Sequence, residues 1–361
     1  MSIKKTQFKL ELILLVCVAF LVIHVMPEVK EELKKQQWQE VGTEKEQEEQ
    51  VCGTLLVVEY ATGSDALLNK EAGIYIPTPT ILPTPVPAET PVPTFVPVPE
   101  TTIRVADLVG TTYMLEELQN LEYLKNKLYI VNSTTKMTEA EFDMEYFISR
   151  DFSVERSEEP QILIFHTHGS EGFANSRAGE SADTIVGAGE LLAQFLREKY
   201  GYQVLHDTTI FDRKNGKDNR NNAYNEALDY LEILLEAYPT IEVIIDLHRD
   251  AGTKRVVTID GKPTAKVMLF NGLCRNTQGK LAYLPNDNLK DNLAFSFQMK
   301  LIGDELYPGL MNRIFLKDYR YNMHLKERYL LIELGTEQNT VEEAKNAMEP
   351  LADVLAQVLG R

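Results

Sequence analysis

The 361-residue sequence is poor in cysteine and in positive charge. Cys17, Cys52 and Cys274 lie far apart and are odd in number, which fits neither a disulfide framework nor a cysteine metal site. Only 37 Lys and Arg stand against 54 Asp and Glu, so the net charge is -17. Because such a chain repels phosphate backbones, we exclude nucleic acid as a partner. A glycan or peptide substrate remains compatible with this composition.

The longest hydrophobic run, residues 12–26, is interrupted only by His24 and follows three lysines. At about 1.5 Å per residue it spans roughly 22 Å, short of the roughly 30 Å hydrocarbon core, but lysines that reach the interface offset part of the deficit. A cleaved signal peptide is the alternative, although residues 25–29 offer no small-x-small cleavage site. We expect a cytoplasmic N-terminus at residues 1–9, a transmembrane anchor at residues 10–26 and export of the rest.

Two segments of biased composition follow the expected anchor. Residues 27–75 begin with many Glu, Lys and Gln, which favours a solvated helical or disordered spacer, and their second half is unassigned. Residues 76–100 carry proline at nearly every second or third position. Proline fixes φ and lacks an amide donor, so this linker should be an extended polyproline II helix of roughly 70 Å. We expect a stiff spacer; a proline ligand for a partner domain is the alternative.

The remaining residues, 101–361, predict one folded α/β domain. Mostly apolar runs predict strands at residues 128–131, 161–165, 204–205, 241–247 and 329–334. Helical spacing occurs between and beyond them, at residues 105–125, 138–149, 188–200, 221–238 and 341–359. This alternation predicts a mixed, mostly parallel sheet flanked by helices on both faces. Such folds bind ligands beyond the carboxyl ends of their strands.

Polar side chains stand at that place in three of the predicted strands. His166, His168 and Glu171 follow the first long strand, His248 follows the second, and Glu333 ends the third. Two histidines and a carboxylate make a three-ligand catalytic zinc site whose fourth position is left for water. This pattern, H-x-x-E with a later His and a later Glu, is similar to that of zinc carboxypeptidases and cell-wall amidases.

We therefore predict that His168, Glu171 and His248 bind Zn2+, with Glu180 as the alternative to Glu171. A further carboxylate, which is not a ligand, must take the proton of the attacking water and pass it to the leaving amine. Glu333 is the candidate for this catalytic role.

Three more residues are candidates for supporting roles. His166 is expected beside the ligands or in the core. Asp246 either orients a ligand imidazole through its second nitrogen or satisfies a buried backbone group. Arg249 either holds a substrate carboxylate or pairs with Asp250, and His206 is expected to be an ordinary surface or core residue.

Four stretches resemble, in order, the motifs of the stage II sporulation protein P family: ILIFHTHGSEGF, HDTTIFD, IEVIIDLHRDA and YNMHLKERYLLIELGTEQNTVEEA. The resemblance covers residues 105–359, and the expected anchor and spacer suit it. It implies a membrane-anchored N-acetylmuramoyl-L-alanine amidase, with an endopeptidase activity also attributed to the family. Such proteins remodel peptidoglycan during engulfment in endospore-forming bacteria, together with the lytic transglycosylase called stage II sporulation protein D.

Residue by residue, the resemblance implies that His168 and His248 bind zinc, that Glu333 is catalytic and that Glu171 fills the family's acidic position. We expect a single-pass protein of the cell membrane whose C-terminal domain lies between forespore and mother cell. Its predicted reaction is cleavage of the amide between N-acetylmuramic acid and L-alanine. The alternatives are a zinc endopeptidase or carboxypeptidase that cuts within the stem peptide, and a non-catalytic tethered wall-binding protein.

Overall fold

The computed structural model describes residues 103–360. The expected anchor at residues 10–26, the spacer at residues 27–75 and the proline-rich linker at residues 76–100 lie outside these residues. Within the described part of the chain, no helix combines the length and the apolar character that a bilayer span requires.

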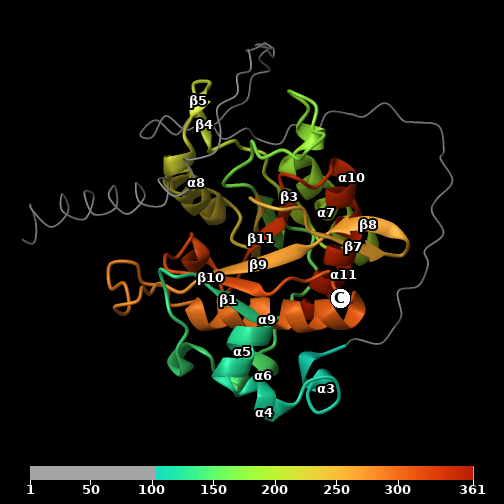
Figure 1. The fold of residues 1–361 in the computed structure, drawn as a ribbon. Coiled ribbons are helices and arrows are strands. Elements are labelled where there is room, and N and C mark those ends of the chain that lie inside the picture. Colours follow the sequence, from blue (N-terminus) through green and yellow to red (C-terminus); the bar gives the residue numbers. More distant parts are fainter. Residues whose placement is uncertain (1–102, 361) are drawn as a thin grey trace, which may run out of the picture. The chain divides into compact units, whose positions relative to one another are not determined.

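A seven-stranded sheet forms the centre of the domain (Figure 1). Its strand order is β1-β10-β9-β11-β6-β2-β3. Neighbouring strands are parallel except β9 and β11, which are antiparallel. The mixed, mostly parallel sheet predicted from the sequence is confirmed. Its strands are β1 (Tyr129–Val131), β2 (Ile162–Phe165), β3 (Val204–His206), β6 (Val243–Asp250), β9 (Val267–Gly272), β10 (Ile314–Lys317) and β11 (Arg328–Thr336).

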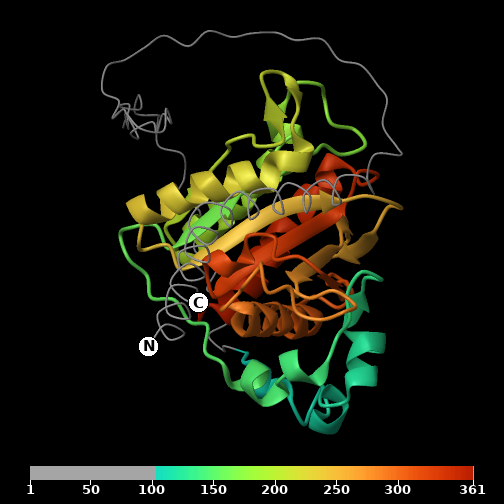
Figure 2. The same cartoon turned by 90° about the vertical axis from the view of Figure 1, so that its left-hand side faces the viewer.

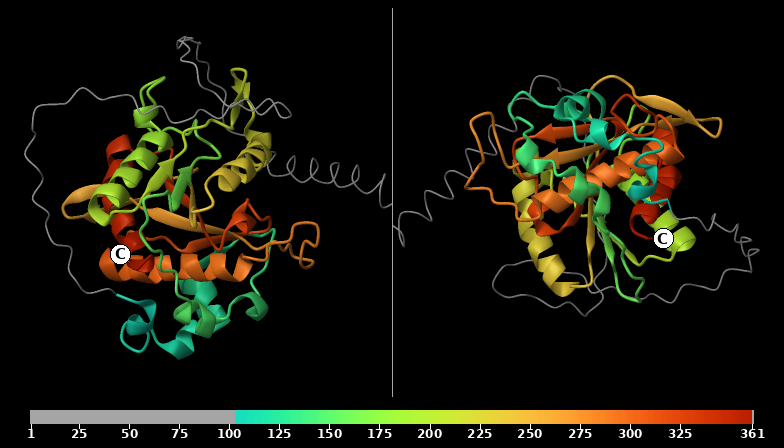
Figure 3. Two further views of the ribbon diagram at one scale, coloured as in Figure 1. Left: turned by 180° about the vertical axis from the view of Figure 1, so that it is seen from behind. Right: turned by 90° about the horizontal axis from the view of Figure 1, so that it is seen from below.

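Helices cover both faces of this sheet, as the sequence predicted. The helices α7 (Ile185–Tyr200), α9 (Leu289–Leu306) and α11 (Met348–Val358) pack on one face, and α8 (Ala223–Ala237) packs on the other (Figures 2 and 3). Because side chains alternate along a strand, each strand contributes to both layers. The faces are named below by α7 and α8.

Short elements complete the domain. Several small helices precede β2: α3 (Val105–Leu108), α4 (Leu115–Leu118), α5 (Leu121–Lys127), η2 (Glu139–Glu141) and α6 (Met144–Ser149). Two of them, α3 and α6, pack against α9 (Figure 2). Two hairpins lie outside the sheet: β4 (Arg213–Lys214) with β5 (Lys217–Asp218), and β7 (Val256–Ile259) with β8 (Lys262–Ala265). The remaining elements are η3 (Ser181–Asp183), η4 (Arg220–Asn222), η5 (Met323–Leu325) and α10 (Val341–Asn346).

Two long helices expected from the sequence are interrupted. The stretch 105–125 forms α3, α4 and the start of α5, because Gly110 has a φ of 87° and the Asn120 side chain caps α5. The stretch 341–359 is divided into α10 and α11. Pro350 lies in the first turn of α11, where its missing amide hydrogen costs no helical bond.

Three elements of the core gave no clear sequence pattern: α9, β9 and β10. From Asn292 to Gly303, every residue of α9 is buried. A helix that is buried all round has no polar stripe, so its sequence lacks the amphipathic period that marks α7 and α8. β9 is antiparallel to β11, and this reversal makes the sheet mixed.

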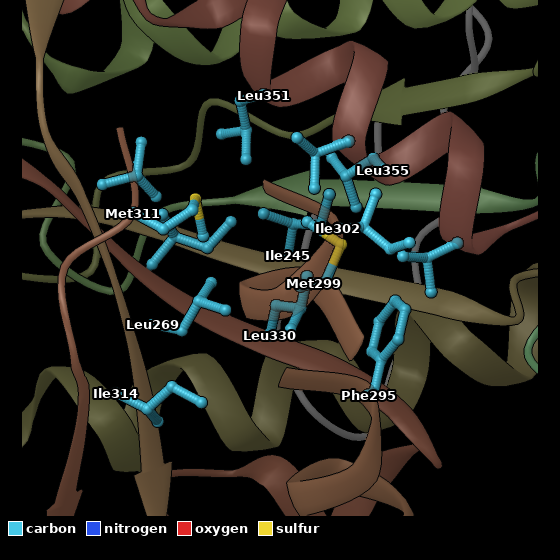
Figure 4. Close-up of a cluster of buried hydrophobic side chains, with 14 of the residues drawn as sticks. Ile245, Leu269, Phe295, Met299, Ile302, Met311, Ile314, Leu330, Leu351 and Leu355 are labelled. Carbon is cyan, nitrogen blue, oxygen red and sulfur yellow. The ribbon is translucent and has the colours of Figure 1, made fainter. Parts of the chain in front are cut away.

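The core beneath the sheet is built from side chains that different strands direct at α9. In Figure 4, Leu269 of β9, Leu330 of β11 and Ile245 of β6 lie close to Met299 and Ile302 of α9. All five belong to one buried cluster, so this layer joins the two halves of the sheet to one helix.

Leu269→Ala should therefore lower the free energy of unfolding by about 2–5 kcal/mol, since it leaves a cavity beneath the sheet. Urea denaturation measures the change. The matched control is Leu115→Ala in α4, where the leucine is 42% exposed, and it should change stability by about 0.5 kcal/mol or less. Equal effects of the two substitutions would contradict this account of the core.

Candidate active site

Strand register brings the first pair of candidate residues together. β6 continues through His248 to Asp250, so His248 lies within the strand and not after it as expected. In the parallel ladder of β6 and β11, Glu333 stands directly opposite His248. Ile244 of β6 and Leu331 of β11 pack in the α8 layer, and the two-residue period places His248 and Glu333 on that same face.

The turn after β2 is held against β6 by a buried carboxylate. Thr167 donates its backbone N–H to Asp246 Oδ1 at 2.9 Å and its hydroxyl to Asp246 Oδ2 at 2.7 Å. Asp246 Oδ1 also lies 2.7 Å from His248 Nε2. Asp246 therefore satisfies a buried backbone group, which is one of its two expected roles, and it also contacts the His248 imidazole.

His168 reaches His248 from this turn. The centroids of the two rings are 5.3 Å apart, with the planes inclined at 76°. Tyr224, in the first turn of α8, lies beside both rings at 5.7 Å from His168 and 6.4 Å from His248. All three side chains are buried.

Glu171, and not the alternative Glu180, lies next to His248. Glu171 Oε2 is 3.7 Å from His248 Nδ1 and accepts a hydrogen bond from the backbone N–H of Arg249 at 3.0 Å. Its other oxygen accepts from the guanidinium of Arg220 in η4. Glu180 is exposed and precedes η3.

The side chain of Arg249 binds to neighbouring groups of the protein. Its Nε donates to the carbonyl of Gly172 at 3.1 Å, which ties the turn after β2 to β6 a second time. In place of the expected alternative, a pair between Arg249 and Asp250, Arg249 Nη1 lies 3.9 Å from Glu337 Oε2 and Asp250 pairs with Arg255 at 2.8 Å.

The sequence reading missed three residues at this site: Asp212, Arg220 and Tyr224. Asp212 Oδ2 lies 3.9 Å from His168 Nδ1 and accepts from the hydroxyl of Ser170 at 2.6 Å. Its place in the motif HDTTIFD was the one available signal. Arg220 and Tyr224 had none, because they come from a later loop and the helix that follows it.

His166 points away from this cluster, to the α7 face. Its Nδ1 donates to the carbonyl of Leu247 at 2.8 Å, and its Nε2 lies 3.0 Å from His206 Nε2. Burial, reinforced by the neighbouring His206, lowers the pKa of His166 to about 3, so its ring is neutral. His206 is thus a buried partner of His166, in keeping with the core position that was one of the two expected for it.

The family model described as stage II sporulation protein P matches residues 103–356. The chain belongs to this family. The stage II sporulation protein P of Bacillus subtilis (strain 168) is 26% identical over 213 residues, which are 55% of this chain and 50% of the relative. The match therefore spans half the length of that relative.

Among solved structures, the chain is similar to three N-acetylmuramoyl-L-alanine amidases. One from Clostridium difficile 630 is 15% identical, with 56% of this chain and 96% of that chain covered and a TM-score of 0.35. AmiC2 of Nostoc punctiforme is 13% identical over 56% of this chain and 96% of its own, with a TM-score of 0.34. The CwlD amidase of Clostridioides difficile, solved with the GerS lipoprotein, is 17% identical over 55% and 96%, with a TM-score of 0.33.

The site is strongly negative around the His248 imidazole. Burial alone lowers the pKa of His248, but the charges of Asp246, Glu171 and Glu333 outweigh burial and raise the pKa to about 9. Burial also raises the pKa of Asp212. The surroundings of His248 thus favour a positive charge, whether a proton or a metal ion supplies it.

The residue types suit zinc, although among residues 103–360 no three His, Cys, Asp or Glu side chains are already placed to hold a metal ion. In tetrahedral zinc sites with ligand bonds of about 2.0–2.2 Å, neighbouring ligand atoms are roughly 3.3–3.6 Å apart. Glu171 Oε2 and His248 Nδ1, at 3.7 Å, come close to this spacing. The contact of His248 Nε2 with Asp246 is the carboxylate–imidazole arrangement that commonly supports a zinc ligand.

In chelator-treated protein, we expect His248 to titrate near pH 9. A histidine whose pKa is raised on folding adds stability that is complete below the unfolded value of 6.5 and is lost as the pH rises through about 9. NMR titration of the histidine rings gives the pKa, and urea denaturation at several pH values gives the stability.

Asp246→Asn should lower the pKa of His248, because it removes the nearest negative charge. Asp229→Asn, an exposed position on α8, is the matched control and should leave this pKa unchanged. A wild-type midpoint at or below 6.5 would show that burial and not the carboxylates governs the ring.

Proposed function

We propose that this chain is a zinc-dependent peptidoglycan hydrolase that cleaves the amide between N-acetylmuramic acid and L-alanine during sporulation. The observation that carries the proposal is the approach of His168 and Glu171 to His248, with Glu333 beside it in the ladder. Membership of the stage II sporulation protein P family supports the context of septal wall remodelling and engulfment.

In this proposal His168, Glu171 and His248 hold the metal. Zinc at such a site polarises a carbonyl and lowers the pKa of water. Asp246 keeps His248 oriented and fixes the turn that carries His168. Arg220 holds the second oxygen of Glu171, which leaves Oε2 directed at His248.

Glu333 is proposed to move the proton. Its carboxylate accepts a proton from the attacking water and delivers it to the departing amine of L-alanine. β11 lies between β6 and β9, so the backbone of Glu333 is fixed from both sides. A base held in this way keeps its distance from His248 through the reaction.

Glu333→Gln should lower the rate of amide cleavage by about 10²–10⁴-fold, because glutamine cannot take up the proton. The assay follows new alanine amino groups released from isolated sacculi by the purified full-length chain. His248→Ala and chelator should abolish the signal, and zinc should restore it after chelation. Glu236→Gln, at an exposed position of α8, is the matched control. Undiminished cleavage by Glu333→Gln would remove Glu333 from the mechanism.

Product masses separate the proposed amidase from a stem-peptide peptidase. An amidase releases the whole stem peptide from the sugar, whereas an endopeptidase or carboxypeptidase releases fragments of it. Intact protein that binds about one zinc per chain and gives neither product would leave only wall binding.

We also propose that the chain is anchored in the cell membrane by residues 10–26, with the described domain outside the cytoplasm. The hydrophobic run after three lysines supports this placement. Fractionation of sporulating cells should find the protein in the membrane. Protease added to protoplasts should remove the domain, and a protected domain would contradict the orientation.

A lytic transglycosylase of the stage II sporulation protein D type is the proposed partner, on the strength of family membership. The two purified proteins should bind each other or should together release more soluble glycan from sacculi than the sum of their separate activities. Independent activities without binding would contradict the partnership.

A further inference from the structure

A hydrogen-bonded chain of contacts runs across three neighbouring strands, on the α7 face. It joins His206, the last residue of β3, to His166, the residue after β2, and then to the carbonyl of Leu247 in β6. At its outer end, His206 Nδ1 lies 2.7 Å from Glu190 Oε2 on α7. The His206 side chain is 2% exposed and that of Glu190 is 59% exposed, so the chain leads from the surface into the sheet.

The donors and acceptors along this hydrogen-bonded chain can be paired in only one way. The Leu247 carbonyl only accepts, so His166 Nδ1 must carry a hydrogen. The neutral His166 ring then accepts at Nε2, so His206 Nε2 donates the hydrogen between the two rings. Burial lowers the pKa of His206, and the hydrogen bond and charge of Glu190 oppose this shift.

The backbone of α7 seals the pair of rings. A Cβ added to Gly189 would lie 2.7 Å from His166 Nε2 and 2.8 Å from His206 Nε2. Such contacts are shorter than carbon and nitrogen atoms tolerate, so only glycine lets the helix lie this close. The same turn of α7 supplies the next residue, Glu190, as the counter-charge.

The hydrogen-bonded chain lies directly behind the candidate active site, which is on the opposite face of the sheet. His166 is two residues before His168, and Leu247 directly precedes His248. The bond from His166 to Leu247 thus ties β2 to β6 at the two points where the proposed metal ligands leave the backbone. Asp246 makes a second tie from the α8 face.

We propose that Glu190 and His206 are positioning residues, which hold the backbone of His168 and His248 in place from behind the sheet by fixing His166 on the Leu247 carbonyl. Neither residue touches the proposed metal or substrate. The effect on metal binding and catalysis rests on the proposed function, whereas the hydrogen-bonded chain itself does not.

The hydrogen-bonded chain from Glu190 to Leu247 is tested by NMR of the full-length protein with ¹⁵N-labelled histidine. His166 should show hydrogen on Nδ1 alone, and His206 should show hydrogen on Nε2. Glu190→Gln should shift the ring signals of both histidines, because it removes the charge beside His206, whereas Glu198→Gln, also exposed on α7, should leave them unchanged. A His166 ring protonated at Nε2, or ring signals unaffected by Glu190→Gln, would overturn the inference.

The positioning role is tested by zinc affinity, measured by competition with a chromophoric chelator, and by kcat/KM on sacculi. His206→Ala should weaken both by about 10–100-fold. His206→Gln should recover most of the loss, because its amide nitrogen can donate to His166 in place of Nε2. Glu198→Gln should match the wild type. A change below about twofold in His206→Ala, or no recovery in His206→Gln, would overturn the role.

Three further outcomes would also support or contradict the proposal. If His206→Ala fails to fold, Glu190→Gln carries the same comparison, because its side chain is at the surface. Wild-type protein that binds zinc but cleaves nothing would remove the proposed activity and leave the positioning role testable by affinity. Wild-type protein that binds no zinc would contradict the proposed function. The ring signals of His166 and His206 would then still test whether the hydrogen-bonded chain is formed.

Discussion

The buried carboxylate of Asp246 is the contact on which the candidate site depends. Burying a charge is costly unless hydrogen bonds and an opposite charge compensate it. Asp246 receives both bonds of Thr167 and lies against His248. It thereby joins the turn that carries His168 to the strand that carries His248. Without it, the turn that carries His168 would lose both hydrogen bonds that it makes to the Asp246 side chain.

The sheet adds to this contact by its strand order. β6 stands between β2 and β11, so residues that are 80 or more positions apart in the sequence become lateral neighbours. All three strands run in the same direction, and their carboxyl ends meet at one edge. The α8 face of that edge carries the negative cluster around His248, and the α7 face carries the chain from Glu190 to Leu247. The α8 face thus carries the candidate ligands together with Asp246, and the α7 face carries the proposed positioning residues.

The charges of the site explain why it suits a cation despite its burial. Asp246, Glu171 and Glu333 surround one imidazole, and Arg220 balances only part of their charge. A proton on His248 relieves the repulsion between the carboxylates when no metal is bound. A divalent ion would do so more fully, which is the electrostatic reason to expect zinc and His248 protonation to compete.

The sequence by itself determined where the central strands lie and which residues are candidates for chemistry. β2, the first three residues of β6 and the middle of β11 are apolar on both faces, so a run of apolar residues marks them without any alternation. His168, Glu171, His248 and Glu333 stood out because polar side chains ended those runs. These signals are local, and a local signal survives without knowledge of the fold.

Only the tertiary structure decided which of these residues meet and what holds them. Arg220 reaches Glu171 across 49 positions, and His206 reaches His166 across 40, through packing that no short pattern encodes. The helix α9 could not be recognised from the sequence for a different reason. Its complete burial removes the polar stripe by which helices are recognised. Contacts between distant segments depend on strand order and helix packing, and the sequence specifies these only through the whole folded chain.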